Sequence, residues 1–385
     1  MNGVGIMKLP KVKDIHSVLF LNDTIRIGTG NDYGIQIDNP DGKYTELIGS
    51  LDGEHAISSI IKNCKNLSEK EIVEAIDLLT DMGYIEDASI RIPSDLSNEE
   101  IERYSVNLNF FNTLADNAKN KYDYQLLLKD THVLLLGLGG IGSNVCLSLA
   151  ELGIGKITAV DFDKVERSNL NRQILYNDTD IGEFKTTAAR DFINKFNSNI
   201  EFAAITQEIS SAEDIEKLIV KTDCDIVVNV ADYPTGYIDF WVNQACVKYD
   251  KVCFSALVGK KNGRVYSIVP HQSACFYCQY MNDLENIPEY EAELRAIREI
   301  KTDKELALYR TPNGALGPAC LFHGYFIASE IMRYVFWGAD RLLTYDQSFS
   351  IDFLTFEQKF TKLHKYENCP VCGKEFRNNG NLESS

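Results

Sequence analysis

Positive charge and long apolar runs are both scarce in this sequence of 385 residues. The formal net charge of -17 argues against nucleic acid or an anionic membrane as the main partner, although it leaves room for a local basic pocket that holds a nucleotide. Lys8 and Lys11 interrupt the first segment, so we expect no secretory signal there. Asn144, Ser148 and Glu151 break the most apolar stretch, so no run is long enough to span a membrane. We therefore expect a cytoplasmic protein that binds neither a membrane nor nucleic acid.

The sequence has ten cysteines, and we expect no secretory signal. Disulfides are rare in proteins that are not exported, so reduced thiols or a metal site are favoured over a disulfide framework. Two C-x-x-C pairs, Cys275 with Cys278 and Cys369 with Cys372, offer the four thiolates that a tetrahedral Zn²⁺ needs. Their long separation suits a structural zinc that clips the C-terminal tail to the body, and a redox role for either pair is the alternative. A catalytic zinc is not expected, because four sulfurs leave no open position. The other cysteines are in apolar surroundings and are expected to be buried: Cys64, Cys146, Cys224, Cys246, Cys253 and Cys320.

The N-terminal hundred residues begin with short β-rich pieces, continue with helical spacing and end with a returning strand. Ser68 and Glu71 form a predicted capping box at the start of the last helix. The predicted strands are Ser17–Leu21, Thr24–Gly28, Gly34–Ile37 and Tyr84–Glu86, and the predicted helices are Tyr44–Leu51, His55–Asn63 and Ser68–Met82. This order predicts a small winged-helix-like α+β domain over residues 1–97. Its last helix has few basic residues, which argues against DNA binding.

This small domain resembles, in architecture and size, the peptide-clamp domains of enzymes that modify ribosomally made precursor peptides. The resemblance implies that the leader segment of a precursor peptide binds as an added strand on an exposed sheet edge. A structural domain used for dimer contacts is the alternative. The polar stretch Ser94–Glu102 then leads into a second domain, predicted over residues 98–385.

The second domain begins with a strand–turn–helix–strand unit. A continuous apolar strand, His132–Leu136, is followed by a glycine turn, a helix over Ser143–Leu152 and a second strand, Lys156–Val160, that ends at Asp161. The glycines are Gly137, Gly139, Gly140 and Gly142. Glycines let a backbone approach phosphates, a helix N-terminus offers unpaired N–H groups, and an acid at this spacing accepts from ribose hydroxyls. We expect a nucleotide site in a Rossmann-like α/β fold; the alternative is that the glycines serve only the packing of a tight turn.

The sequence beyond this unit carries a family resemblance. It continues Asp161-Phe-Asp-Lys-Val-Glu-Arg-Ser-Asn-Leu-Asn-Arg-Gln173, then Gly-Glu-Phe-Lys185, and Asp232 follows the apolar strand Asp225–Val230. From about Glu102 onward the chain resembles the E1-like adenylating family. That family includes ubiquitin-activating enzymes and the bacterial enzymes that adenylate sulfur-carrier proteins. The chain is most similar to the peptide-adenylating members of microcin biosynthesis, which also have an N-terminal clamp domain.

The resemblance implies a site for ATP and Mg²⁺ in addition to the structural zinc. It places the four glycines and Asp161 around the nucleotide, Asn169, Arg172, Gln173 and Lys185 around the triphosphate, and Asp232 on magnesium near the α-phosphate. A carboxylate that attacks the α-phosphorus builds negative charge on the non-bridging oxygens and on departing pyrophosphate. Two fixed cations, Arg172 and Lys185, together with a metal ion answer that charge.

Two features of the chain differ from the family pattern. The family begins this domain with Arg-Tyr-x-Arg-Gln, whose second arginine reaches into the partner's nucleotide site, but here Val106 replaces that arginine and Arg103 is the nearest substitute. The charged stretch Met281–Arg310 reads as a helical excursion before a long apolar helix, Ala319–Phe336. No cysteine occurs from Gln279 to Leu316, where some members form a thioester, which argues against acyl transfer to an enzyme thiol.

We therefore expect ATP-dependent adenylation of the C-terminal carboxylate of a ribosomally made precursor peptide. One alternative is activation of a sulfur-carrier protein that ends in Gly-Gly. Another is a non-catalytic E1-like scaffold that presents leader peptides, although such a scaffold is expected to have lost Arg172, Lys185 and Asp232. A homodimer is expected, because members of the family pair through the nucleotide domain.

Overall fold

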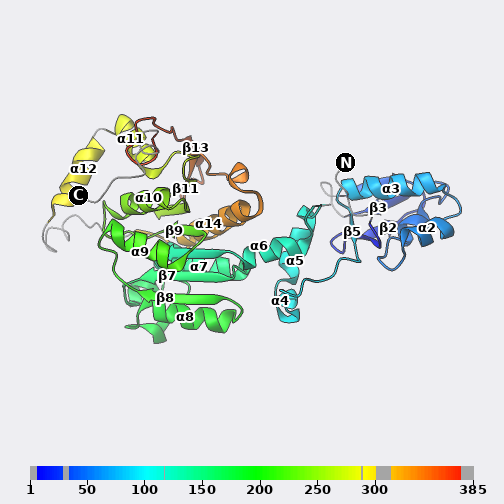
Figure 1. The fold of residues 1–385 in the computed structure, drawn as a ribbon, viewed down its shortest axis with the longest axis horizontal. Helices are drawn as coiled ribbons and strands as arrows, with labels where there is room; N and C mark the ends of the chain where they lie inside the picture. Colours follow the sequence, from blue (N-terminus) through cyan, green and yellow to red (C-terminus); the bar gives the residue numbers. More distant parts are fainter. Residues whose placement is uncertain (1–6, 29–33, 117, 288, 301–313, 374–385) are drawn as a thin grey trace. The chain divides into compact units, whose positions relative to one another are not determined.

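The chain forms two compact units, Met1–Leu126 and Leu127–Ser385 (Figure 1). The computed structural model describes residues 7–28, 34–116, 118–287, 289–300 and 314–373. The sequence predicts a domain boundary between residues 97 and 98, whereas the contacts group the chain up to Leu126 with the first unit. The last part of the predicted helical excursion, 301–310, lies outside the described residues.

The first unit contains a three-stranded antiparallel sheet, β2-β3-β4, and a two-stranded sheet, β1-β5. Its strands are β1 (Pro10–Val12), β2 (Val18–Phe20), β3 (Thr24–Ile27), β4 (Ile35–Asp38) and β5 (Ile85–Asp87), and its helices are α1 (Thr45–Gly49), α2 (Ile57–Asn63), α3 (Glu69–Asp81), α4 (Asn98–Arg103), α5 (Ser105–Leu114) and the start of α6 (Lys121–Lys129). Ile25 and Ile27 of β3 pack with Ile60 of α2 and Ile72 of α3 in one core. The predicted strands and helices are present with ends shifted by a few residues, and β1 was not predicted.

Two sets of side-chain hydrogen bonds stabilise this unit. Glu71 N–H donates to Ser68 Oγ at 3.3 Å and Ser68 N–H donates to Glu71 Oε2 at 2.8 Å, so the predicted capping box is confirmed. Lys13 is only 1% exposed, and its Nζ donates to the carbonyls of Asn112 (2.7 Å) and Ala115 (3.2 Å) at the end of α5. A buried ammonium group without hydrogen-bond partners would destabilise the fold. The bonds from Lys13 to these carbonyls therefore hold the end of α5 against the small sheets. They are one physical reason why the first unit extends past residue 97.

The second unit is built on an eight-stranded sheet in the order β13-β12-β11-β10-β9-β6-β7-β8. The strands from β8 to β10 in that order are parallel, and β10 to β13 form antiparallel pairs. The strands are β6 (His132–Leu136), β7 (Lys156–Asp161), β8 (Glu201–Thr206), β9 (Ile226–Asn229), β10 (Val252–Val258), β11 (Asn262–Ile268), β12 (Gln347–Asp352) and β13 (Gln358–Lys362). This mixed α/β architecture confirms the predicted fold class.

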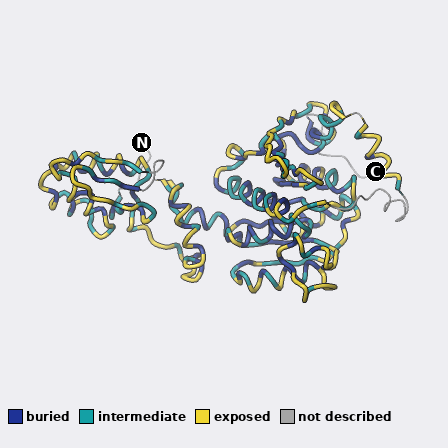
Figure 2. Tube along the Cα trace, turned by 180° about the vertical axis from the view of Figure 1, so that it is seen from behind, coloured by how far each residue is buried: buried dark blue, intermediate teal, exposed yellow. Residues whose placement is uncertain are grey.

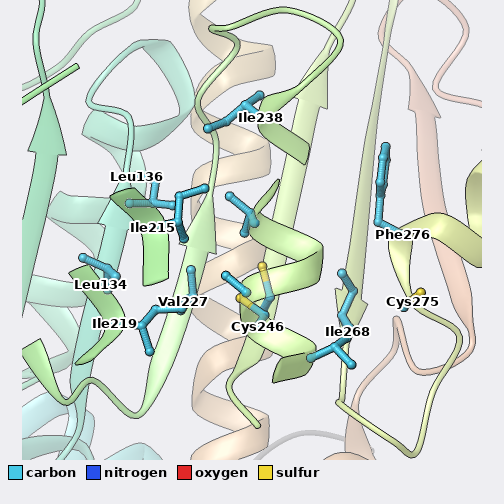
Figure 3. Close-up of a cluster of buried hydrophobic side chains, with 14 of the residues drawn as sticks. Leu134, Leu136, Ile215, Ile219, Val227, Ile238, Cys246, Ile268, Cys275 and Phe276 are labelled. Atoms are coloured by element: carbon cyan, nitrogen blue, oxygen red, sulfur yellow. The ribbon is translucent and has the colours of Figure 1, made fainter. Parts of the chain in front are cut away.

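Helices cover both faces of this sheet, and the middle strands are buried (Figures 1 and 2). The helices are α7 (Gly140–Leu152), α8 (Lys185–Phe196), α9 (Ala212–Thr222), α10 (Ile238–Lys248), α11 (Phe276–Asn286), α12 (Glu289–Glu299) and α14 (Gly317–Trp337), with short 3-10 turns at Arg167–Asn169, Asp178–Asp180 and Ala339–Arg341. Figure 3 shows Val227 of β9 packed with Ile219 of α9, and Cys246 of α10 in the same core. Among the residues described, no helix is long and apolar enough to cross a membrane.

Candidate functional site

The carboxyl ends of three neighbouring parallel strands meet at one edge of the large sheet. Leu136 at the end of β6 pairs with Val160 of β7 and with Asn229 of β9. The loops after these strands therefore begin side by side, at the edge where open parallel sheets bind their ligands. All of the predicted nucleotide residues lie at the ends of these strands, on the loops after them or in the helices that follow.

The loop after β6 is a glycine turn that serves both packing and access. Gly137 has φ +94°, and a Cβ there would lie 2.9 Å from the backbone nitrogen of Ala231. A Cβ on Gly142 would collide with the carbonyl of Gly137. Gly139 is the N-cap of α7, and nothing described lies within 4 Å of its Cβ position. The turn packs tightly on the end of β9 and still leaves a helix N-terminus open to an anion.

Two acids and a lysine lie at the end of β7, in the loop after it and at the start of α8. Asp161 accepts hydrogen bonds from the N–H groups of Leu138 (2.7 Å) and Asp163 (2.8 Å), which joins this loop to the glycine turn. Lys185 is a buried residue at the start of α8, and its Nζ lies 2.7 Å from Asp163 Oδ2. Burial raises the pKa of Asp161, and the positive charge of Lys185 opposes that rise. The loop thus holds an acceptor and a fixed cation beside the glycine turn.

The segment from Asn169 to Gln173 folds over the glycine turn. The Asn169 carbonyl accepts from the N–H groups of Arg172 and Gln173, each at 3.0 Å. Arg172 lies across Gly140, whose Cβ position is 3.4 Å from Arg172 Cγ and Cδ, and Arg172 Nη1 donates to the Ser168 carbonyl at 2.8 Å. Gln173 is buried, and in the described part of the chain its Oε1 has no hydrogen-bond partner. Buried acceptors usually have a partner, so this unpaired oxygen next to Arg172 in the sequence needs an explanation.

Asp232 lies on the loop after β9, on the other side of β6 from Asp161. Its side chain is exposed, and its carbonyl accepts from Thr235 Oγ1 at 2.9 Å. The rings of Tyr233 and Phe162 lie 5.7 Å apart, so the loops after β9 and β7 are in contact. The structure therefore brings Asp232 to the same edge as the predicted nucleotide residues.

The sequence did not predict that α12 would hold the Asp232 loop in place. Arg298 of α12 donates through Nε (3.1 Å) and Nη2 (3.0 Å) to the Gly236 carbonyl. Its guanidinium also lies 5.2 Å from the ring centre of Tyr237 and 4.8 Å from that of Phe240. Only one sequence signal points to this contact: Arg298 follows the buried Leu294 at helical spacing, on the same face of the helix.

A second group that the sequence did not single out is Asp239 in the first turn of α10. Asn229 Nδ2 at the end of β9 donates to its Oδ1 at 2.8 Å. Burial raises the pKa of Asp239 to about 6, and the hydrogen bonds from Asn229 and Tyr266 oppose that rise. Asp239 thus connects α10 to the strand that precedes the Asp232 loop.

The two C-x-x-C pairs come together as predicted. The sulfurs of all four cysteines lie within 4.8 Å of one another, with Cys275 3.7 Å from Cys369 and Cys278 3.5 Å from Cys372. A tetrahedron with Zn–S bonds of about 2.3 Å has sulfur–sulfur edges of roughly 3.8 Å. Asn243 Nδ2 lies 3.6 Å from Cys275 Sγ, as expected for a donor that supports a metal-bound thiolate. This four-cysteine cluster is compatible with zinc, and Figure 3 shows Cys275 at the border of the core.

The remaining predicted positions lie in the first unit or in the core. Arg103 ends α4, and Val106 in α5 is 76% exposed. Replacement of the missing arginine by Arg103 stays a prediction. The six cysteines outside the two pairs are all buried, as expected.

Several known proteins are similar to this chain. The adenylyltransferase and sulfurtransferase UBA4 of Candida albicans is 26% identical over 253 residues, which are 65% of this chain and 52% of UBA4. The adenylyltransferase and sulfurtransferase MOCS3 of Culex quinquefasciatus is 33% identical over 189 residues, 49% of this chain and 40% of MOCS3. The chain therefore spans about half the length of the curated relatives it matches.

Two solved structures share the fold over nearly the whole chain. A crystal structure of E. coli MccB with AMPCPP and MccA has a TM-score of 0.70 at 22% identity and covers 95% of this chain and 100% of its own. A crystal structure of PaaA has a TM-score of 0.68 at 19% identity and covers 92% and 100%. The profile of the ThiF family matches residues 104–371, which include the glycine turn, both loops and three of the four clustered cysteines. The chain therefore belongs to the ThiF family.

Proposed function

We propose that this protein uses ATP to adenylate the C-terminal carboxylate of a precursor peptide. The observation that carries the proposal is the convergence of three charged side chains at one sheet edge: Arg172 across the glycine turn, Lys185 beside Asp163, and Asp232 on the neighbouring loop. Phosphate binding needs cations and backbone N–H groups, and adenylation needs a metal ion at the α-phosphate. Its ThiF-family relatives are named as adenylyltransferases, which agrees with this reaction.

The residues of the crevice suit ATP in particular positions. The open N-terminus of α7 at Gly139 would receive phosphate oxygens, and Asp161 would accept from the ribose hydroxyls. Gln173 Oε1, which has no partner among the described residues, would accept from a nucleotide N–H or O–H group. The remaining assignments are those the family resemblance implied: Gly137, Gly140 and Gly142 at the nucleotide, and Asn169 at the triphosphate.

The reaction is a substitution at the α-phosphorus. A carboxylate oxygen of the peptide forms a bond to that phosphorus, the bond to the α,β-bridging oxygen breaks, and pyrophosphate leaves. Arg172 and Lys185 would neutralise the charge that grows on the phosphate oxygens. Asp232 would hold Mg²⁺, which supplies further positive charge to the phosphates when bound.

A peptide is the carboxylate source that we favour. β2 lies at an edge of the three-stranded sheet, and Leu19, Phe20 and Leu21 are each about half exposed there. Such an edge suits an added peptide strand, so residues 1–97 would act as a leader clamp. The fold of MccB, which was crystallised with the peptide MccA, covers 95% of this chain.

A sulfur-carrier protein that ends in Gly-Gly is the second candidate. Both curated relatives named above are described as adenylyltransferases and sulfurtransferases. A non-catalytic scaffold is less consistent with this chain, because Arg172, Lys185 and Asp232 are all present. We also propose a homodimer, and a structural zinc on Cys275, Cys278, Cys369 and Cys372.

Pyrophosphate exchange tests the proposal. The purified protein with a candidate peptide, encoded by a short open reading frame beside the gene, should exchange labelled pyrophosphate into ATP. Asp232→Asn should abolish the exchange with an unchanged circular dichroism spectrum, whereas Asp250→Asn, an exposed loop aspartate of the same unit, should not. Exchange that survives Asp232→Asn would refute the metal assignment, and exchange with a Gly-Gly carrier alone would favour the second candidate.

A further inference from the structure

A shallow hollow with about 20 Å³ of accessible space, partly open to solvent, lies in the antiparallel half of the large sheet. Its lining is mostly apolar, with two lysines at the turn between β10 and β11. The residues that matter here are Lys260 and Lys261 in that turn, Leu316 and Ala319 at the start of α14, and Phe353 and Leu354 after β12. Neither the sequence motifs nor the proposed nucleotide contacts account for this hollow.

The hollow opens at the same sheet edge as the nucleotide residues. β10 is parallel to β9, and β12 runs in the direction of β10 because both are antiparallel to β11. The turn after β10 and the residues after β12 therefore lie at the carboxyl edge, next along the sheet from the Asp232 loop. A peptide that brings its terminal carboxylate to the α-phosphate can cross this edge on its way to the nucleotide.

The first turn of α14 connects the hollow to the nucleotide residues. Leu316 and Ala319 line the hollow, while a Cβ on Gly317 would lie 2.8 Å from the Asn171 carbonyl. The sulfur of Cys320 lies 2.7 Å from the Cβ position of Gly140. The two places are thus on different sides of one helical turn, which is about 10 Å across.

The floor of the hollow is held in place by buried aromatic packing. Phe353 lies 5.6 Å from the ring of the fully buried His323 and 5.9 Å from the ring of Phe322. The imidazole of His323 fills the place that a Cβ on Gly263 would need. Binding to a site that is already rigid orders fewer side chains, so less of the binding free energy is lost as conformational entropy.

The charge at the rim also points to a class of ligand. Lys260 and Lys261 are exposed, and neither forms an ion pair within the described ranges. These two adjacent exposed lysines create a local positive field, which the carboxylate of Asp352 near Lys261 reduces in part. An acidic group beside an apolar side chain is complementary to this surface.

We propose that the hollow binds the end of an aliphatic side chain of the substrate peptide, two or three residues before its C-terminal residue, with an acidic neighbour at Lys260 and Lys261. The proposal rests on the proposed function for the position of the carboxylate. An extended peptide advances about 3.4 Å per residue, so roughly three residues span the turn of α14 between the hollow and the glycine turn. Residues 259–261 and 353–354 are then specificity determinants, separate from the residues that bind ATP.

Labelled hexapeptide pools with a free carboxyl terminus test this inference. Each pool fixes one position as leucine or serine and a neighbour as glutamate or glutamine, and binding to the full chain is measured by fluorescence anisotropy without ATP. Burial of one methyl group of leucine corresponds to about fourfold tighter binding, so we expect that preference at the two stated positions only. Pyrophosphate exchange is measured on the same pools.

Matched variants identify the surface responsible. Leu354 is 71% exposed, so Leu354→Asp should remove the leucine preference without disturbing the core, whereas Phe356→Asp, 67% exposed and outside the hollow, should keep it. Lys260→Glu with Lys261→Glu should reverse the glutamate preference, and Lys359→Glu should not.

The outcomes separate the two proposals. No leucine preference in the wild type, or a preference that Leu354→Asp leaves intact, would overturn the assignment of the hollow. The preference without any pyrophosphate exchange would support the hollow and refute adenylation. Exchange at equal rates on every pool would support adenylation and refute the hollow.

Discussion

The parallel half of the large sheet ends in loops with open backbone N–H groups and charged side chains, whereas the antiparallel half ends in an apolar hollow with two lysines at its rim. The first arrangement suits phosphates, which are alike in every nucleoside triphosphate. The second, on our proposal, suits a side chain of the substrate. The comparison suggests that one edge of a sheet can combine an invariant chemical step with a variable choice of substrate.

The largest expected effect breaks the parallel half alone. Lys185→Met keeps the apolar stem of a buried lysine and removes the charge beside Asp163, so pyrophosphate exchange should fall about 10²- to 10³-fold. Lys164→Met is the control, because Lys164 is exposed and lies over the ring of Phe184. Leu354→Asp should leave the KM for ATP unchanged. If Leu354→Asp raised the KM for ATP as much as Lys185→Met does, the separation of the two halves would be contradicted.

The four-cysteine cluster is the next place to test, because it ties the C-terminal segment to the core of the second unit and belongs to neither set of loops. Cys369→Ser should lower the zinc content from about one ion per chain to near zero and lower the unfolding midpoint by about 10 °C. Metal analysis and a thermal scan measure both. Cys64→Ala, a buried cysteine of the first unit, should keep the zinc. Full zinc content after Cys369→Ser would be evidence against the site.

Arg298 tests the parallel half through a residue outside the sequence motifs. Arg298→Ala removes two hydrogen bonds to the Gly236 carbonyl and should lower exchange about tenfold, with a higher Mg²⁺ requirement. Arg298→Lys should rescue little, since an ammonium lacks the fork and the planar face. Arg295→Ala, one turn away with only an exposed pair to Glu291, should behave as wild type. An unchanged Mg²⁺ requirement would show that Arg298 does not position Asp232.

The smallest expected effect is a pH dependence of stability from Asp239. Its pKa is about 6 in the folded protein and about 3.9 in an unfolded chain, so the folded state binds the proton more tightly. Stability from this group is therefore present at low pH and is lost as the pH rises through 6. Because Asp239 is partly exposed, we expect only about 1 kcal/mol between pH 5 and pH 7. Urea unfolding of the wild type and of Asp239→Asn at pH 5 and pH 7 measures this change. If the free energy of unfolding changes by the same amount between the two pH values in both proteins, the assignment is contradicted.

Much of the parallel half was predictable because its elements depend on local patterns. The continuous apolar run His132–Leu136 and the glycines after it identify a buried strand and the turn that follows, and both are present. The capping box at Ser68 is local in the same way. The two C-x-x-C pairs were predictable over a long interval because tetrahedral coordination restricts which groups can meet.

The rest depends on contacts between distant segments that leave little trace in the sequence. Arg298 is one charge among many in its stretch, and only the packing of α12 on the Gly236 loop distinguishes it. The hollow combines three separate segments, around Lys260, Leu316 and Leu354, none of which has a motif. The buried contact of Lys13 with Asn112 likewise joins residues that are far apart along the chain.

The first turn of α14 contacts both the glycine turn and the hollow. Its Gly317 and Cys320 pack against the residues around the glycine turn, and Leu316 and Ala319 wall the hollow from the other side. If the proposed function holds, a change to that helix made to alter the choice of peptide would also alter the binding of ATP. The safer starting points are the exposed side chains of Lys260, Lys261 and Leu354, which lie outside that helix.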